Sequence, residues 1–150
     1  MEPTRAMLPH VIIHESAQLI DWASDRLGIQ FFADARAIGW GAYPEIRAAA
    51  IYERWSGNDC VVHLVSDEKP GWLTRNFIAA GFYFPFVMGG LQRVTGLVPA
   101  ANARARRLNL HFGYREEGCL RRGAENGDDI IIMGMLREEC RFISEEHRHG

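Results

Sequence analysis

Lysine is nearly absent from this sequence of 150 residues, since Lys69 is the only one and arginine supplies the remaining basic residues. The 17 basic residues face 19 acidic ones, which gives a formal net charge of −2. A protein without an overall positive field is not expected to bind nucleic acid in general. Cysteine is also scarce, because Cys60, Cys119 and Cys140 are an odd number at wide spacing. This pattern argues against a disulfide scaffold or a structural zinc site, and it predicts a reducing compartment and no bound metal.

Long apolar segments are missing as well. The longest, residues 78–91, is too short to span a bilayer and is interrupted by glycine and proline. The first ten residues contain no apolar stretch of the kind found in signal peptides. Apolar residues make up 47% and charged residues 24%, which is the balance of an ordinary globular protein. We therefore expect one cytoplasmic domain over residues 1–150, with a core at about 11–143 and a polar tail at 144–150 that frays.

Hydrophobic periodicity and turn signals divide the chain into helices and strands. Ser16 can cap the first helix and Gly28 can end it, Pro85 should kink or end the second, and Asn102 and Gly113 bound the third. The expected helices cover residues 16–28, 72–88 and 102–112, and the expected strands cover residues 35–40, 46–55, 60–66, 93–98, 114–121 and 130–136. This order predicts an α/β (α+β) domain in which helices pack on a largely antiparallel sheet.

The connection between strand 60–66 and the next helix has the features of a phosphate-binding site. The N–H groups at the start of a helix lack partners within the helix and lie at the positive end of its dipole. Here Gly71 lets the backbone approach a ligand closely, Thr74 adds a hydroxyl, and Lys69 and Arg75 add positive charge. An ordinary strand–helix connection would have a similar composition, so both interpretations stay open.

A second connection of this kind leads from strand 93–98 to the helix that begins at Asn102. An asparagine at this position can cap the helix, and it can also bond to an amide of a ligand. Arg104, Arg106 and Arg107 follow on the helix. They form either a solvated face, as most charge runs do, or a site for a terminal phosphate, because arginine matches phosphate oxygens in a bidentate fork.

Together the two connections resemble the GNAT superfamily of N-acetyltransferases over residues 36–142. The family's diphosphate signature, Gln/Arg-x-x-Gly-x-Gly/Ala, falls on residues 69–74 (KPGWLT) and is only partly preserved. Residues 102–118 (NARARRLNLHFGYREEG) follow the family's Asn-x-x-Ala…Gly-Phe-x-x-Glu-Gly block more closely. Where relatives often carry a tyrosine that protonates the leaving thiolate, this chain has Asn109. The segments GWLTRNF and MGMLREECRF resemble small acetyltransferase-like proteins of bacteriophages and prophages.

The resemblance implies the GNAT fold, which has a mixed, mostly antiparallel central sheet of about six to seven strands flanked by about three to four helices. It also implies a V-shaped splay between strands 60–66 and 93–98, in which acetyl-CoA would bind. The residues implied to bind acetyl-CoA are Leu64, Val65, Lys69, Gly71, Trp72, Leu73, Thr74, Arg75, Asn102 and Arg106.

The implied reaction transfers the acetyl group directly to a primary amine, on a small molecule or a protein, in a ternary complex. A base must take a proton from the amine, and His63 on the splayed strand is the first candidate. Its alternative role is that of a satisfied core histidine. Glu53 on the neighbouring strand is the second candidate, and its alternative is an exposed strand carboxylate.

The altered residues at 69–74 and Asn109 support a different hypothesis. The chain would then be a binding protein of phage origin that keeps the GNAT scaffold without the chemistry and acts in the host cytoplasm. Neither hypothesis involves a membrane. A homodimer is expected to form through strand 130–136 if that last strand lies at an edge of the sheet.

Overall fold

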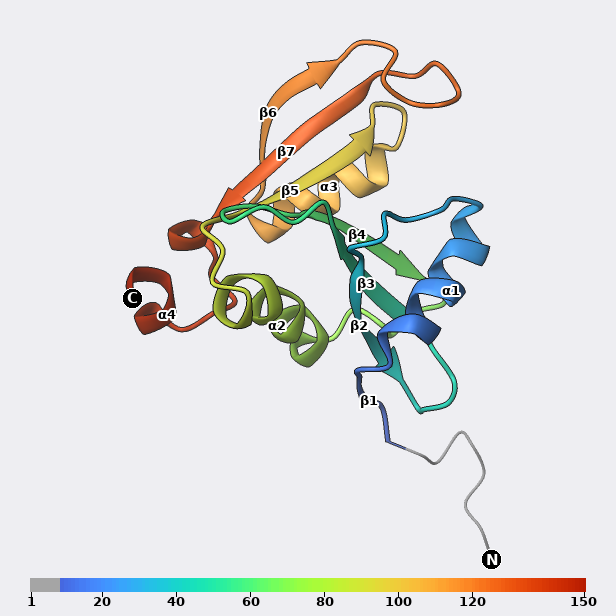
Figure 1. Cartoon of the computed structure of the whole chain (residues 1–150), viewed down its shortest axis with the longest axis vertical. Helices are drawn as coiled ribbons and strands as arrows, with labels where there is room; N and C mark the ends of the chain where they lie inside the picture. Colours follow the sequence, from blue (N-terminus) through green and yellow to red (C-terminus); the bar gives the residue numbers. More distant parts are fainter. Residues whose placement is uncertain (1–8) are drawn as a thin grey trace, which may run out of the picture.

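The computed structural model describes residues 9–150, so most of the segment examined for a signal peptide lies outside it. Within these residues, seven strands form one sheet in the order β1-β2-β3-β4-β5-β7-β6, and every pairing is antiparallel except that of β4 with β5 (Figure 1). This confirms the predicted architecture. The strands are β1 (Val11–Ile13), β2 (Arg36–Gly41), β3 (Ala48–Glu53), β4 (Val61–Ser66), β5 (Arg93–Pro99), β6 (Arg115–Leu120) and β7 (Ile130–Leu136).

The part of the chain that the structure describes contains the three expected helices and a fourth α-helix at the C-terminus. They are α1 (Ser16–Leu27), α2 (Arg75–Tyr83), α3 (Ala103–Phe112) and α4 (Glu145–His149). The expectation of a frayed tail is wrong, because the Ser144 side chain caps α4 and Arg137 donates a hydrogen bond to the His147 carbonyl at 2.8 Å. Within residues 9–150, no helix has both the length and the apolar character needed to cross a bilayer.

Helix α1 covers one face of β2, β3 and β4. Leu19 and Ala23 are fully buried on this face, in a small core with residues of the three strands. The expected Ser16 cap is wrong, because Ser16 is the first helical residue and its hydroxyl exchanges two hydrogen bonds of 3.0 Å with the backbone of Ala37. That hydroxyl therefore fastens α1 to β2. Gly28 ends the helix in the left-handed conformation, as expected.

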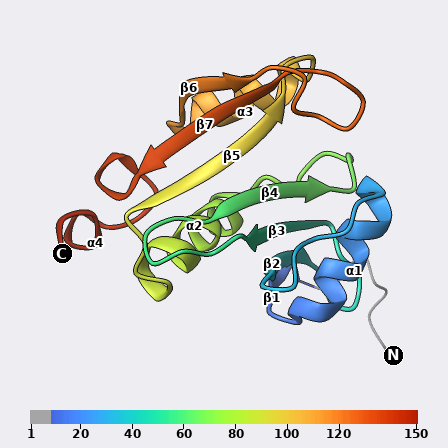
Figure 2. The ribbon, with the colours of Figure 1, turned by 45° about the horizontal axis from the view of Figure 1, so that its top comes forward.

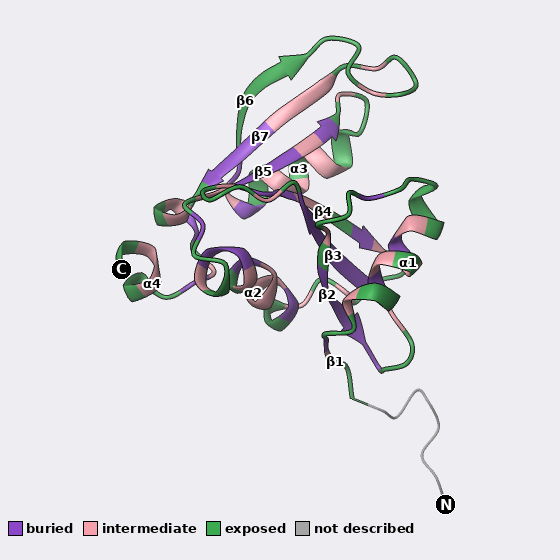
Figure 3. Ribbon diagram, in the orientation of Figure 1, coloured by how far each residue is buried: buried purple, intermediate pink, exposed green. Residues whose placement is uncertain are grey.

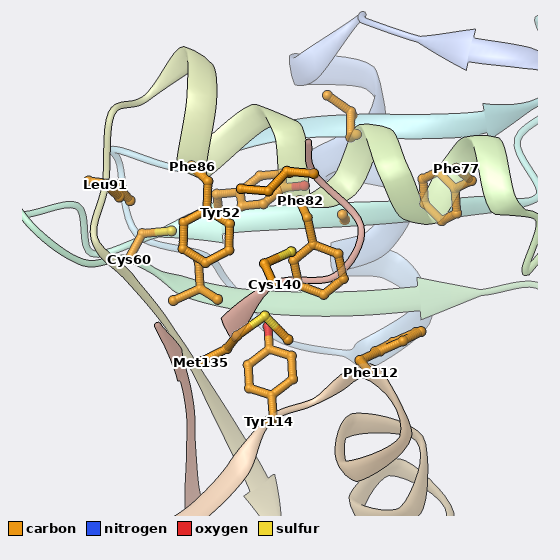
Figure 4. Close-up of a cluster of buried hydrophobic side chains, with 14 of the residues drawn as sticks. Tyr52, Cys60, Phe77, Phe82, Phe86, Leu91, Phe112, Tyr114, Met135 and Cys140 are labelled. Carbon is orange, nitrogen blue, oxygen red and sulfur yellow. The ribbon is translucent and has the colours of Figure 1, made fainter. Parts of the chain in front are cut away.

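Helices α2 and α3 cover the opposite face and enclose the larger core (Figures 1 and 3). Aromatic rings from both helices and from the C-terminal segment meet there. Phe82 stacks on Phe86 (Figure 4), and it also stacks on Phe142. The sheet is thus sandwiched between helices along β2–β4. The candidate site lies where this sheet changes from its first half to its second.

The regular α-helical part of the second helix ends just before Pro85, as predicted. It begins at Arg75, later than expected, because Thr74 caps it by accepting the N–H of Phe77. Its last turn, Phe84–Met88, is π-helical and contains Pro85. Proline has no N–H, so it cannot donate to the carbonyl of Gly81 four residues earlier. The hydroxyl of Tyr52 donates to that carbonyl instead, at 2.5 Å.

The last strand is not an edge of the sheet, which corrects the expectation on which a dimer through strand 130–136 was based. Strand β7 lies between β5 and β6, so the edges are β1 and β6. All residues of β6 are exposed (Figure 3), and its pairing with β7 is interrupted by a shift in register between Glu116 and Gly118. Such irregularities twist an edge strand away from further pairing.

Candidate functional site

The sheet opens between β4 and β5. Strands β3 and β4 pair along their whole length, and so do β5 and β7, whereas Val61 with Thr95 is the one register pair that joins β4 to β5 in the described chain. The Thr95 N–H donates to the Cys60 carbonyl at 2.9 Å at this point. Beyond it the two strands diverge, as Figure 2 shows. The geometry is the predicted V-shaped splay.

A polar network secures the closed end of the splay. The hydroxyl of Thr95 donates to the Asp59 carboxylate at 2.8 Å and accepts a hydrogen bond from Arg93 Nε at 3.0 Å. Arg93 also pairs with Glu117 on β6 at 2.6 Å. The hydrogen bond with Glu117 raises the pKa of Arg93, and the same bond lowers the pKa of Glu117. The network therefore joins β5 both to Asp59, just before β4, and to Glu117 within β6, at the point where the opening begins.

A cleft of about 590 Å³ occupies the splay, which is within the range of small-molecule sites. Side chains from both faces of the sheet line it: His63 and Val65 of β4 lie on the α1 side, whereas Val62 and Leu64 lie on the side of α2 and α3. Arg26 of α1 also lines the cleft. The cleft can therefore receive a ligand from each face of the sheet.

The backbone of β4 offers hydrogen bonds to a ligand in the cleft. Along a strand, the N–H and C=O groups of alternate residues point to the same side. The Cys60 carbonyl points to β5, and so Val62 and Leu64 direct their backbone groups into the opening. This orientation allows the predicted binding through Leu64, which stays a prediction. The backbone groups of Val65 point to β3 instead, and its side chain is buried among α1 and β3.

Arg47 shapes the loop between β4 and α2. Its guanidinium pairs with Asp67 at 2.5 Å and donates to the carbonyls of Pro70 at 2.7 Å and Lys69 at 3.3 Å. Partial burial raises the pKa of Asp67, but the hydrogen bonds from Arg47 and the Lys69 N–H outweigh it, so the pKa is lowered overall. Arg47 is not among the residues predicted from the sequence, because its partners become visible only in the register of β3 with β4.

The start of α2 lies at the mouth of the cleft. Trp72 and Leu73 line the cleft directly, while Lys69 and Arg75 are exposed beside it. Gly71 adopts a φ of 96°, which favours glycine, and a side chain there would meet open space. The Thr74 hydroxyl is occupied by the N–H of Phe77. The N–H groups of the first helical turn before Phe77 are therefore those that can bind an anion.

The start of α3 lies across the cleft. Asn102 lines the cleft, and its Oδ1 caps the helix by accepting the N–H of Ala105 at 3.1 Å. Its amide nitrogen is the group that can serve a ligand. Arg106 pairs with Glu116 at 2.8 Å and does not line the cleft, so its role in binding acetyl-CoA stays a prediction. Arg104 lines the cleft in its place.

His63 and Glu53 meet on the α1 side of the sheet. Nε2 of His63 lies 2.6 Å from Oε2 of Glu53. The Glu53 carboxyl is buried, with 3% of the residue exposed, and its other oxygen accepts the N–H of Phe32 at 2.8 Å. The expectation of an exposed carboxylate is therefore wrong. Phe31 packs edge-on against the imidazole, with ring centroids 5.3 Å apart, and His63 still lines the cleft.

This pair has the arrangement of a general base with an orienting carboxylate. Because Nε2 faces Glu53, the Nδ1 atom is the nitrogen left to accept a proton from a group in the cleft. Asn109, which lines the cleft opposite, directs its amide to the sulfur of Met133 at 3.7 Å. Among the described residues, no group of three or more His, Cys, Asp or Glu side chains comes together as a metal site would require.

No family model matches the sequence, and no curated protein matches it. Solved structures do. An acetyltransferase of the GNAT family from Streptococcus pneumoniae superimposes with a TM-score of 0.66 at 16% identity, over 85% of this chain and 99% of that one. A chimera of the Vibrio cholerae spermidine N-acetyltransferase SpeG and hSSAT superimposes with a TM-score of 0.70 at 14% identity, over 85% of this chain and 95% of that one.

A further match is the Vibrio cholerae spermidine N-acetyltransferase in complex with CoA and spermine, with a TM-score of 0.62 at 15% identity. That match covers 71% of this chain and 68% of the other. This chain spans 65% of the length of a mutant form of the same enzyme. At these identities the likeness concerns the fold. The chain has the fold of the GNAT acetyltransferases.

Proposed function

We propose that the protein is an N-acetyltransferase that transfers the acetyl group of acetyl-CoA directly to a primary amine within a ternary complex. The observation that carries the proposal is the cleft at the splay, which has the start of α2 at its mouth, the backbone groups of Val62 and Leu64 directed into it, and a histidine–carboxylate pair on the side of α1. Two substrates can thus meet in the opening from opposite faces of the sheet. The GNAT fold of the structural neighbours supports the same proposal.

The groups of the cleft fit the parts of acetyl-CoA. The backbone of Val62 and Leu64 would bond to the amides of the pantetheine arm, as an added strand does. The N–H groups at the start of α2 would hold the diphosphate, with Lys69 and Arg75 beside it and Arg104 across the mouth. Asn102 would offer its amide nitrogen to the pantetheine. Acetyl-CoA supplies the activated acyl carbon.

The chain's own chemistry lies in the proton transfer. The amine must lose a proton to become a nucleophile, and Nδ1 of His63 would accept it, directly or through a water. Glu53 would hold the imidazole in place and stabilise the positive charge that it acquires. Because Glu53 is buried and receives the N–H of Phe32, its own position is fixed. The acceptor would be a small amine or a protein amine.

The test measures release of the CoA thiol with a panel of amines, beginning with spermidine and spermine because they relate to structural neighbours. With an active amine, H63N should lower kcat about 100-fold or more, and E53Q should also lower it. Neither substitution should change the affinity for acetyl-CoA. The matched control is H111N, because His111 is an exposed histidine of α3 outside the cleft. Full turnover in H63N would exclude His63 as the base.

A second candidate function is that of a binding protein that keeps the scaffold without catalysis, such as a phage-encoded factor. The observation that favours it is Asn109, whose amide faces Met133 and provides no phenolic proton donor. The same assay distinguishes the two. Binding of CoA without thiol release for any amine of the panel would support the binding protein, and release above background would exclude it.

A further inference from the structure

The α1 side of the cleft is largely apolar. Val61 and Thr95 form the register pair that joins β4 to β5, so the side chains at every second position from each lie on one face of the sheet. On β4 this is the face of His63, and on β5 it is the face of Leu97, which also lines the cleft. Leu27, the last residue of α1, lines the cleft as well and is exposed. An acceptor that reaches His63 therefore passes between apolar side chains.

Arg26 brings a positive charge to this side of the cleft. It lies in the last turn of α1, which passes the carboxyl end of β4 (Figures 1 and 2). Its Nε donates to the Ser66 carbonyl at 3.0 Å, and its guanidinium stacks over the Trp22 ring, 5.0 Å from the centroid. These two contacts hold the guanidinium in place. Within residues 9–150 its Nη groups make no hydrogen bond or ion pair, so they can bind an anion at the cleft.

Carboxylates that could bind a second ammonium group are scarce here. Among the residues that the structure describes, Glu68 is the acidic side chain that lines the cleft, in the exposed loop after β4. Asp67 beside it pairs with Arg47, and both oxygens of Glu53 already accept or share a hydrogen bond. A polyamine would place its further positive charges near Arg26, where like charges repel. An amine that carries a negative charge would be attracted instead.

The spacing between base and arginine sets the length of the acceptor. Ser66 lies three residues beyond His63 on β4, which corresponds to about 10 Å along the strand. An α-amino acid carries its amine and its carboxylate on one carbon, so it is too short to bind His63 and Arg26 together. A linear amino carboxylate such as 6-aminohexanoate is long enough, because the hydrogen bonds at its two ends cover about 3 Å each.

We propose that the acceptor is a primary amine with a carboxylate several bonds away, and that Arg26 binds this carboxylate while His63 takes the proton of the amine. The inference rests on the proposed function, because it assumes acetyl transfer to an amine at His63. Arginine suits the role, since two of its N–H groups match the two oxygens of a carboxylate. The methylene chain between the two ends lies against Leu27 and Leu97. Arg26 is thus a residue that determines specificity.

Release of the CoA thiol with three matched amines tests the inference. The amines 6-aminohexanoate, hexylamine and 1,5-diaminopentane share a chain of five methylene groups and end in a carboxylate, a methyl group and an ammonium group. For the wild type we expect kcat/KM to be about tenfold higher with 6-aminohexanoate than with hexylamine, as a charge-assisted hydrogen bond in a partly exposed site provides. The value with 1,5-diaminopentane should be the lowest. Glycine should react poorly, because it cannot reach both ends.

Substitutions of Arg26 separate recognition of the charge from other effects. R26Q should lower kcat/KM for 6-aminohexanoate to the value for hexylamine, and it should leave the reaction of hexylamine and the affinity for acetyl-CoA unchanged. R26E should reverse the order and favour 1,5-diaminopentane. The control is R36Q, since Arg36 is an exposed arginine of β2 outside the cleft. Titration of 6-aminohexanoate into protein saturated with CoA should show weaker binding by R26Q without any turnover.

Equal kcat/KM values for the three amines in the wild type, or a preference for 1,5-diaminopentane, would overturn the inference and leave the proposed function intact. An R26Q variant that reacts more slowly with all three amines alike, or that binds acetyl-CoA more weakly, would also overturn it, because Arg26 would then act on the fold or on the donor. Absence of thiol release with every amine, spermidine and spermine included, would overturn the proposed function and the inference with it. Cooperative thermal unfolding of R26Q and R26E shows that the variants are folded.

Discussion

Replacing Thr95 by valine should weaken the closed end of the splay, because valine keeps the shape of threonine and removes its hydroxyl. Thr95 is 7% exposed, and its hydroxyl binds the Asp59 carboxylate and accepts from Arg93. Asp59 and Arg93 are partly exposed, so water can replace part of the hydrogen bonding that the variant lacks. A hydrogen bond to a charged group contributes about 1.5–3 kcal/mol to the free energy of unfolding. Because water compensates in part, we expect T95V to lower that free energy by about 1–2 kcal/mol.

Thermal unfolding measures the effect, and a loss of this size lowers the melting temperature by about 2–8 °C in a domain of this length. Because β4 and β5 are joined at this point alone within the described chain, T95V should also bind acetyl-CoA several-fold less tightly. T95S keeps the hydroxyl and should restore the affinity. If T95V matches the wild type in both melting temperature and affinity, the polar network does not determine the geometry of the cleft.

Three further predictions concern the loop before α2 and the thiols. R47M removes the bonds that hold this loop, and titration should show a roughly tenfold weaker affinity for acetyl-CoA; equal affinity would mean that the loop keeps its shape without Arg47. Asp67 has a lowered pKa in the folded state, so its contribution to stability is complete above about pH 4 and disappears as pH falls through the folded value. In acid unfolding curves, R47M should lose less stability on acidification than the wild type does, because Asp67 lacks its partner there. Identical curves would contradict the assignment of the lowered pKa to Arg47. A thiol reagent at pH 8 should modify Cys119 in the native protein and should reach Cys60 and Cys140 only after denaturation, because both are buried and burial raises the pKa of Cys60 to about 12; native reaction of all three would contradict the buried placement.

Local signals predicted most of the fold. The capping residue Asn102 and the terminating glycines at 28 and 113 act within a few residues, so their effect is visible in the sequence. Ser16 shows the limit of this reasoning, because a hydroxyl at a helix start can bond instead to a distant strand, as it does to Ala37. Strand β1 has three residues, too few to show any periodicity.

The site was less predictable than the fold. His63 and Glu53 lie ten positions apart, and their contact depends on the register that sets Ile51 opposite His63. Both residues were predicted from their chemistry, but their contact is not visible in the sequence. Arg106 was predicted to bind acetyl-CoA and Arg104 was not, because the sequence does not reveal that Glu116, ten residues away on β6, pairs with Arg106.

The central claim is that the splay between β4 and β5 binds a CoA thioester. Thermal unfolding with and without acetyl-CoA, with free CoA as the control, tests it most directly. At about 100 times the dissociation constant the ligand stabilises the fold by about 2.7 kcal/mol, which predicts a rise of about 5–10 °C for both ligands. An unchanged melting temperature at millimolar acetyl-CoA and CoA, in protein that unfolds cooperatively, would contradict the claim.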